Sequence, residues 1–205
     1  MVSLLFTILG VISLISLLLV FLVYWNVPEL NNLHGKIVLN NVMSIVFVTI
    51  FILIVYNIVM YDNLFCKIIG YFGYFSTMSM FSWMTIMCID LSCVLKSEEL
   101  QHHLSGKLRL RIYSVVGWGA GLLLALVLFI LEQSVPEGSN LNPKIGKQTC
   151  FISGENDKLL YLFHLPILIM MLTNIFFYTL ILVNLCRAQK ATRRARLSRR
   201  YYSCS

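Results

Sequence analysis

Five long stretches without a charged side chain constrain this chain more than any other feature of its sequence. They are Val2–Tyr24, Ile37–Tyr61, Ile68–Ile89, Ile112–Leu131 and Leu159–Cys186. Each has at least the roughly 20 residues that a helix needs to cross about 30 Å of hydrocarbon. Because backbone polar groups must be paired inside lipid, such runs predict helices, and the alternating polarity of a β-barrel is absent. The sequence predicts an all-α, multi-pass transmembrane helix bundle.

The composition supports this interpretation. Of 205 residues, 59% are hydrophobic and 12% are charged, which is about half the charge of an ordinary soluble domain. No internal repeat, Gly/Ser linker or low-complexity tract divides the chain. We therefore expect one bundle over residues 1–187 and a basic tail over residues 188–205. The helices are expected at about residues 2–24, 37–61, 66–95, 112–131 and 159–186.

The first apolar run has a second interpretation as a signal peptide that is removed. Three features favour a transmembrane helix instead. No basic segment precedes the run, its apolar stretch is longer than 20 residues, and no small-x-small cleavage site follows it.

The distribution of basic residues predicts the orientation. Twelve of the 16 Lys and Arg residues lie in Trp25–Lys36, in Lys96–Arg111 and in the tail from Arg187. The positive-inside rule assigns these segments to the cytosol of a plasma-membrane protein. The N-terminus is then outside, the C-terminus is cytosolic, and the loop Glu132–Lys158 lies outside.

This topology singles out two of the six cysteines. Cys66 precedes the third apolar run and Cys150 lies in the long outer loop, so only these two face an oxidising space. The other four, Cys88, Cys93, Cys186 and Cys204, lie within the third span or at the cytosolic end of the fifth. We predict a Cys66–Cys150 disulfide, with two unpaired thiols as the alternative.

Five segments, together with this disulfide, resemble the secretin-like (family B) G-protein-coupled receptors, and within them the Methuselah-like receptors of insects. They are LNNLHGKIVLNNV (30–42), CKIIGYFGYFSTMSMFSWMTIMCIDL (66–91), RIYSVVGWG (111–119), NPKIGKQTCF (142–151) and LPILIMMLTNIFFYTLILV (165–183). The resemblance implies a receptor for an extracellular ligand, with peptides as one candidate class. It also implies signalling through a heterotrimeric G protein.

The chain departs from that family in several ways. It begins at the first helix and ends in a segment that matches the start of the third cytosolic loop. The resemblance therefore implies a chain truncated to the first five helices of a seven-helix receptor fold. Gly121 stands where such receptors often have proline in helix four, and Met87 stands about where helix three has glutamate. The family's helix-two histidine also has no match.

Three polar residues within the apolar runs are candidates for conformational switching. Asp90 is an acid inside the third span, which is costly in lipid and is usually functional or paired. The structural alternative is that its carboxylate reaches the membrane interface or hydrogen-bonds to a neighbouring helix. Asn40 and Asn174 are expected to hydrogen-bond between helices and are most simply packing residues.

Four residues are predicted to shape the helices. Pro166 is expected to kink the fifth helix, because proline lacks the N–H of a helical hydrogen bond. Gly117, Trp118 and Gly119 are expected to form a close helix contact, since small residues let two backbones approach.

The basic tail has two interpretations. Anionic lipid attracts each basic residue near the membrane surface by about 1 kcal/mol, so a lipid anchor is the simple one. The resemblance adds contact with the G protein, and we expect no nucleic-acid partner. The basic residues are Arg187, Lys190, Arg193, Arg194, Arg196, Arg199 and Arg200.

No enzyme chemistry is indicated by the sequence. It shows no catalytic residue, no phosphate-binding loop, no metal site and no cofactor, and the pair His102–His103 is isolated. A receptor is the preferred function. The alternatives are a non-signalling membrane protein or a channel- or transporter-like bundle, which would need charged or broken helices along a path. Five helices alone are expected to signal little.

Overall fold

The protein folds almost entirely into long helices. The structure is a computed structural model that describes residues 2–57, 64–96, 105–136, 139, 142–146, 149–152 and 160–203. Five of its helices are long and apolar enough to cross a membrane, and the described residues contain no strand, so the predicted all-α bundle is confirmed. The helices are α1 (Val2–Asn26), α2 (Leu33–Asn57), α3 (Leu64–Lys96), α5 (Gly106–Ser134) and α6 (Leu165–Ser203), with short turns η1 (Pro28–Leu30) and η3 (Leu160–His164).

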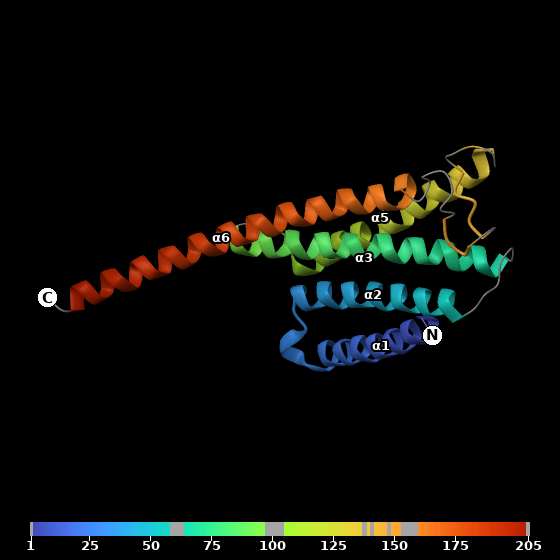
Figure 1. Cartoon of the computed structure of the whole chain (residues 1–205). Helices are drawn as coiled ribbons and strands as arrows, with labels where there is room; N and C mark the ends of the chain where they lie inside the picture. The colour runs from blue at the N-terminus through green and yellow to red at the C-terminus, as the bar shows by residue number, and fades with distance from the viewer. Residues whose placement is uncertain are drawn as a thin grey trace.

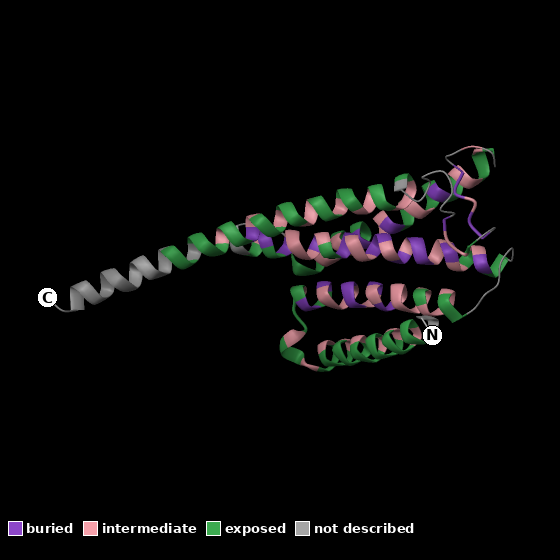
Figure 2. Cartoon of the chain, viewed as in Figure 1, coloured by how far each residue is buried: buried purple, intermediate pink, exposed green. Residues whose placement is uncertain are grey.

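Helix α3 is the centre of the bundle. It packs against α2, α5 and α6, whereas α1 packs mainly against α2 at the edge (Figure 1). Burial follows the same order, because α3 has the largest buried share of the five helices and α1 is exposed along its length (Figure 2). The exposed leucines, isoleucines and valines of α1 suit a helix that faces lipid.

Three buried serine hydroxyls on α3 form hydrogen bonds within their own helix. Ser76, Ser82 and Ser92 donate to the carbonyl oxygens of the residues four positions earlier, at 2.6 to 3.0 Å. These bonds satisfy polar groups that lipid cannot. Helix α3 therefore carries many polar residues and still lies inside the bundle.

Two apolar clusters lie along α3. Near its start, Tyr74, Met78 and Leu128 pack with the loop residues Ile145 and Ile152. Nearer its end, Trp83 and Ile86 pack with Ile37 of α2, and these three side chains are at most 3% exposed. Thus α3 contributes to both parts of the core.

Close approach of α5 to α3 depends on two glycines. A Cβ atom at Gly117 would lie 2.5 Å from the Trp83 ring, and one at Gly121 would lie 2.8 Å from the Phe75 carbonyl oxygen. The predicted close contact at Gly119 was wrong, because no described atom lies within 4 Å of a Cβ placed there. Residues 117 and 121 are one helical turn apart and share a face, whereas Gly119 lies on another side of the helix.

This geometry gives a matched pair of variants. Gly121→Leu is expected to destabilise the protein by about 2 kcal/mol or more, because the added side chain meets backbone atoms of Phe75 and Ser79 on α3 as well as the Ser79 hydroxyl. Gly119→Leu adds the same atoms into open space and should leave the unfolding temperature nearly unchanged. Thermal unfolding of both proteins in detergent measures the difference. Equal effects would contradict the assignment of Gly121 to the α3 contact.

Helix α6 starts with an irregular turn. The π-helical turn η3 comes directly before Leu165, so Pro166 is the second residue of α6 rather than the site of a kink within it. In a regular helix the N–H of residue 166 would bond the Leu162 carbonyl, and proline has no N–H. The Tyr74 hydroxyl of α3 donates to this carbonyl at 2.8 Å, which ties α6 to the centre of the bundle.

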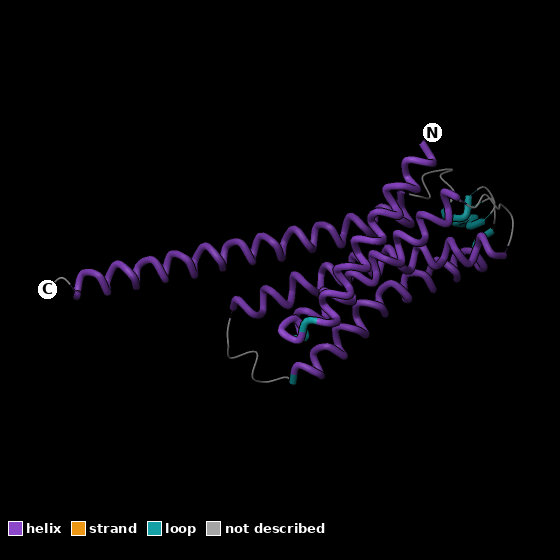
Figure 3. The backbone as a smooth tube through the Cα atoms, turned by 90° about the horizontal axis from the view of Figure 1, so that it is seen from below, coloured by secondary structure: helices purple, strands orange, loops and turns teal. Residues whose placement is uncertain are grey.

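Helix α6 is much longer than a membrane requires. Its 39 residues extend about 58 Å at 1.5 Å per residue, against about 30 Å of hydrocarbon. The helix accordingly projects beyond the other four (Figures 1 and 3). Residues predicted to form a separate tail from 188 onward instead continue this helix to Ser203, since no proline or glycine follows Pro166.

Candidate functional site

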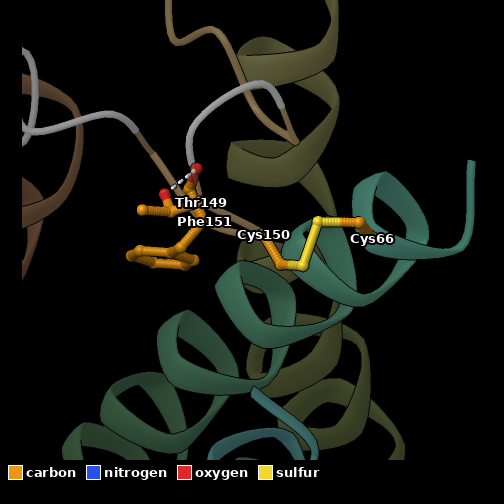
Figure 4. Close-up of a disulfide and its surroundings, with 4 residues drawn as sticks. All are labelled: Cys66, Thr149, Cys150 and Phe151. Carbon is orange, nitrogen blue, oxygen red and sulfur yellow. Dashed lines mark hydrogen bonds between the residues drawn. A yellow bond between two sulfur atoms is a disulfide. The ribbon is translucent and has the colours of Figure 1, made fainter. Parts of the chain in front are cut away.

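A disulfide joins α3 to the loop that follows α5. Cys66 in the first turn of α3 is bonded to Cys150, 84 residues later, with their Cα atoms 4.8 Å apart (Figure 4). The predicted pair is therefore present. We call this end of the bundle the disulfide end. Gly70, one turn along α3, permits the approach, because a Cβ atom there would overlap the Cys150 carbonyl group.

The described part of this loop is packed into the bundle rather than lying free. Pro143, Ile145 and Ile152 are buried, and Phe151 contacts the rings of Phe51 on α2 and Phe163 in η3, with centroids 5.6 and 4.9 Å away. The loop therefore bridges α2, α3 and the start of α6. The Thr149 hydroxyl donates to the Phe151 carbonyl oxygen at 3.1 Å, as the dashed line in Figure 4 marks.

Asn142 joins the loop to the end of α5. Its Nδ2 donates to the carbonyl oxygens of Val135 at 2.6 Å and Glu132 at 3.3 Å, and its Oδ1 accepts from the backbone N–H of Lys144 at 3.0 Å. The last carbonyls of a helix have no partner within the helix. The side chain of Asn142 supplies that partner and fixes the direction in which the chain leaves α5.

Glu132 connects the same end of α5 to α3. Its carboxylate accepts a hydrogen bond from the Tyr71 hydroxyl and lies 3.6 Å from Lys67 Nζ. The Glu132 side chain is 11% exposed and that of Lys67 is 40% exposed, so the carboxylate is shielded from water while the ammonium group is not. Glu132 was not identified from the sequence, because only polar residues inside the five apolar runs were considered as candidates. Glu132 follows the fourth run and was assigned to the loop.

At the opposite end of α3, Asp90 is the centre of a polar cluster. Its side chain is 2% exposed, and its Oδ1 accepts from Arg109 Nη2 of α5 at 2.7 Å and from the Tyr113 hydroxyl at 3.4 Å. Its Oδ2 lies 3.5 Å from Nδ1 of His34 on α2. The cluster thus joins α2, α3 and α5. We call this the Asp90 end.

Neither Arg109 nor His34 was identified from the sequence as a partner of Asp90. Arg109 and His34 lie in segments that were treated as loops, because the helices were delimited by the absence of charge. The helix-two histidine of secretin-like receptors was expected to have no match in this chain. The structure nevertheless pairs a histidine of α2 with an acid of α3. Among the parts of the chain described, no group of three potential metal ligands occurs.

Asn40 and Trp118 form a second polar contact between helices. Trp118 Nε1 of α5 donates to Asn40 Oδ1 of α2 at 3.1 Å, and Asn40 Nδ2 donates to the Lys36 carbonyl oxygen at 2.8 Å. The Trp118 ring lies against Phe47, Phe75 and Trp83 at centroid distances of about 6 Å. Both residues therefore hold α2 and α5 together across α3.

The remaining candidates differ from these two clusters. The Asn174 amide is buried and has no hydrogen-bond partner among the described residues, so the structure contains no helix-to-helix bond there. Arg187 and Lys190 are exposed on the projecting part of α6. Other predicted residues lie outside the described residues or side chains: His102, His103, Arg193, Arg194, Arg196, Arg199, Arg200 and Cys204.

These features define a class of protein. The chain has five membrane-length helices, with α3 at their centre. A disulfide ties a loop to one end of α3, and a buried ion pair lies at the other end. This is the architecture of a multi-pass helical membrane protein. The model of the family "7 transmembrane receptor (Secretin family)" matches residues 1–204. The chain belongs to this family, which is a class of receptors, and it is a multi-pass protein of the plasma membrane.

Individual relatives agree with this membership. Over 183 residues the chain is 31% identical to the Probable G-protein coupled receptor Mth-like 4 of Drosophila melanogaster, covering 88% of this chain and 35% of the relative. It is 26% identical to the G-protein coupled receptor Mth of the same species, covering 85% and 34%. The resemblance to Methuselah-like receptors is confirmed. The chain spans about a third of the length of these relatives.

Proposed function

We propose that this protein acts as a G-protein-coupled receptor. The observation that carries the proposal is the position of α3, which holds a disulfide-tied loop at one end and a buried ion pair at the other. A ligand that displaces the loop would move the same helix that holds Asp90. The family membership favours this function over a channel- or transporter-like bundle.

The proposed orientation puts the disulfide end outside the cell and the Asp90 end in the cytosol. Two features support it. Disulfides persist in oxidising compartments, and basic residues at the Asp90 end, such as Lys36, Arg109 and Arg187, follow the positive-inside rule. The N-terminus would then be outside, and the projecting part of α6 would reach into the cytosol, where it would contact the G protein.

The proposed switch is a shift between two packings of α2, α3 and α5. The Asp90–Arg109 pair and its neighbours His34 and Tyr113 hold one packing. A ligand shifts the population only by its difference in affinity for the two packings. The hydrogen bond between Asn40 and Trp118 is proposed to support the same packing as the Asp90–Arg109 pair. Asn174, whose amide is buried and unpaired, is proposed to gain a partner in the other.

A chimera with a named relative tests the receptor function. Residues of this chain replace the matching segment of the Drosophila Mth receptor, and energy transfer between labelled receptor and a panel of Gα subunits measures recruitment in cells. We expect recruitment at the level of unmodified Mth at equal surface density. Asp90→Asn in the chimera should raise recruitment without ligand severalfold, because it removes the anion that holds Arg109. Normal surface density with no recruitment by the chimera, while Mth itself recruits, would contradict the proposal.

Cysteine labelling tests the orientation separately. After mild reduction of intact cells, an impermeant maleimide should label Cys150, the more exposed of the two disulfide cysteines, but not a cysteine introduced at Lys190. Permeabilisation should then expose the latter. A Cys186→Ser background removes the nearest native thiol. Labelling of position 190 in intact cells would reverse the proposed topology.

A further inference from the structure

A groove at the Asp90 end borders the Asn40–Trp118 contact. It encloses about 680 Å³ and lies between α1 and α2, with one residue of α5 at its far side. Apolar and aromatic side chains form most of its surface, including Tyr24, Trp25, Leu39, Met43 and Leu110. Its volume is within the range of about 300–1,000 Å³ typical of small-molecule sites.

Lys36 is the only charged residue among the described residues that line the groove. It is exposed in the first turn of α2, and no described residue forms an ion pair with it. The described acids Glu29 and Asp90 form no ion pair with it. Glu29 is exposed on η1, and Asp90 is already paired with Arg109. Within the described part of the chain, the Lys36 ammonium group therefore has no ion-pair partner and lies at one end of an apolar groove.

Among the other polar residues of the groove, the Asn40 amide is already engaged. Asn40 uses its amide oxygen for Trp118 and its amide nitrogen for the Lys36 carbonyl. A hydrogen-bonding ligand such as a sugar or nucleotide would find few partners there. An occupant has to match one cation and a long apolar surface.

The surroundings supply such a molecule. The groove lies between two helices of membrane-crossing length, and Lys36 lies in the first turn of α2, at the helix end where headgroups are expected. Tyr24 and Trp25 in the last turn of α1 are the amphipathic rings typical of that depth. Trp25 is 68% exposed, which leaves it free to contact an acyl chain.

We propose that this groove binds an anionic phospholipid, with its phosphate on the Lys36 ammonium group and one acyl chain along Leu39 and Met43. The charge complementarity of one phosphate and one lysine, above an apolar channel, favours this occupant over a second copy of the chain. The lipid would fill the space between α1 and α2 and hold α1 against the bundle. This binding does not depend on coupling to a G protein.

Quenching of Trp25 fluorescence by brominated lipid provides the test. The full chain is reconstituted in phosphatidylcholine vesicles with a minor share of phosphatidylserine, and only the phosphatidylserine carries bromine in its acyl chains. Quenching is measured against vesicles in which an equal share of phosphatidylcholine is brominated instead. We expect severalfold stronger quenching by the anionic lipid. A Trp25→Phe protein gives the background from the buried Trp83 and the partly buried Trp118.

Two variants and one control define the site. Lys36→Ala should weaken the selective quenching about fivefold, the loss expected for one basic residue at an anionic surface. Leu39→Phe combined with Met43→Phe narrows the channel and should reduce quenching while Lys36 remains. Lys190→Ala removes the same charge from α6, away from the groove, and should change quenching less than twofold. Unfolding temperatures confirm that each variant is folded.

Three results would overturn the proposal. If the two brominated lipids quench the unaltered protein equally at the same mole fraction, the groove does not select anionic lipid. If Lys36→Ala and Lys190→Ala lose the same share of the selective quenching, the preference for anionic lipid comes from general surface charge rather than from the groove. Quenching that is lost only when the protein concentration in the vesicle falls would indicate a second copy of the chain as the occupant.

Discussion

Replacing Asp90 by asparagine is expected to lower the free energy of unfolding by about 3–5 kcal/mol, the loss typical when one partner of a buried ion pair is removed. The expectation follows from burial. The Asp90 side chain is 2% exposed and that of Arg109 is 13% exposed, so an uncompensated guanidinium group would remain where water reaches it poorly. Unfolding in a mixed detergent series would measure the change.

A double-mutant cycle separates the ion pair from the packing around it. Arg109→Gln alone should also be strongly destabilising, because it leaves the Asp90 carboxylate buried with only Tyr113 and His34 nearby. The double variant Asp90→Asn with Arg109→Gln should recover much of the loss, since neither charge is then unpaired. Glu29→Gln removes an exposed acid near the same end and should change stability little. Additive losses in the double variant would show that the two side chains act independently.

Removing the Cys66–Cys150 disulfide is expected to cost about 4 kcal/mol. The bond closes a loop of 84 residues, and the chain-entropy model gives roughly this value for loops near 100 residues. Cys150→Ser should therefore lower the unfolding temperature markedly. It should also release the aromatic contacts of Phe151 with Phe51 and Phe163, because the neighbouring bond holds this segment over α3.

Limited proteolysis and thermal unfolding measure the two effects of Cys150→Ser. Cleavage between residues 142 and 152 should become faster, and chemical reduction of the unaltered protein should reproduce both changes. Cys186→Ser is the matched control, because Cys186 is a free, exposed thiol on α6. An unfolding temperature for Cys150→Ser equal to that of this control would show that the loop packing, rather than the disulfide, provides the stability.

The helices could be predicted from the sequence because their physical cause is local. A run without charge that is long enough for the bilayer has few alternatives to a helix. The same rule misplaced the ends. Helix α2 begins at Leu33 and α5 at Gly106, before the uncharged runs start, because Lys36 and Arg109 lie on helical turns. Long basic side chains reach polar surroundings from inside a helix end, so a charge does not end the helix.

The candidate site could be predicted only in part, because its pairs depend on how helices are rotated. The disulfide required only topology, since two cysteines shared the predicted outer side. Asp90 was noticed as an isolated acid, but its pairing with Arg109 requires α3 and α5 to turn these two residues toward each other. The same uncertainty explains Gly119, which was expected to form a close contact because it is small, whereas Gly117 and Gly121 face α3.

The π-helical turn at Leu160–His164 determines how the whole of α6 is rotated about its long axis. A π-helical turn carries about one residue more than an α-helical turn, and each residue advances a helix by about 100°. Deleting one residue there would restore ordinary winding and rotate the remaining helix about its long axis by that amount. Ile181, which is 4% exposed, would then swing out of its present contacts, and the sides of α6 that carry Asn174, Arg187 and Lys190 would turn with it. One extra residue in η3 thus determines which side of α6 faces the rest of the bundle.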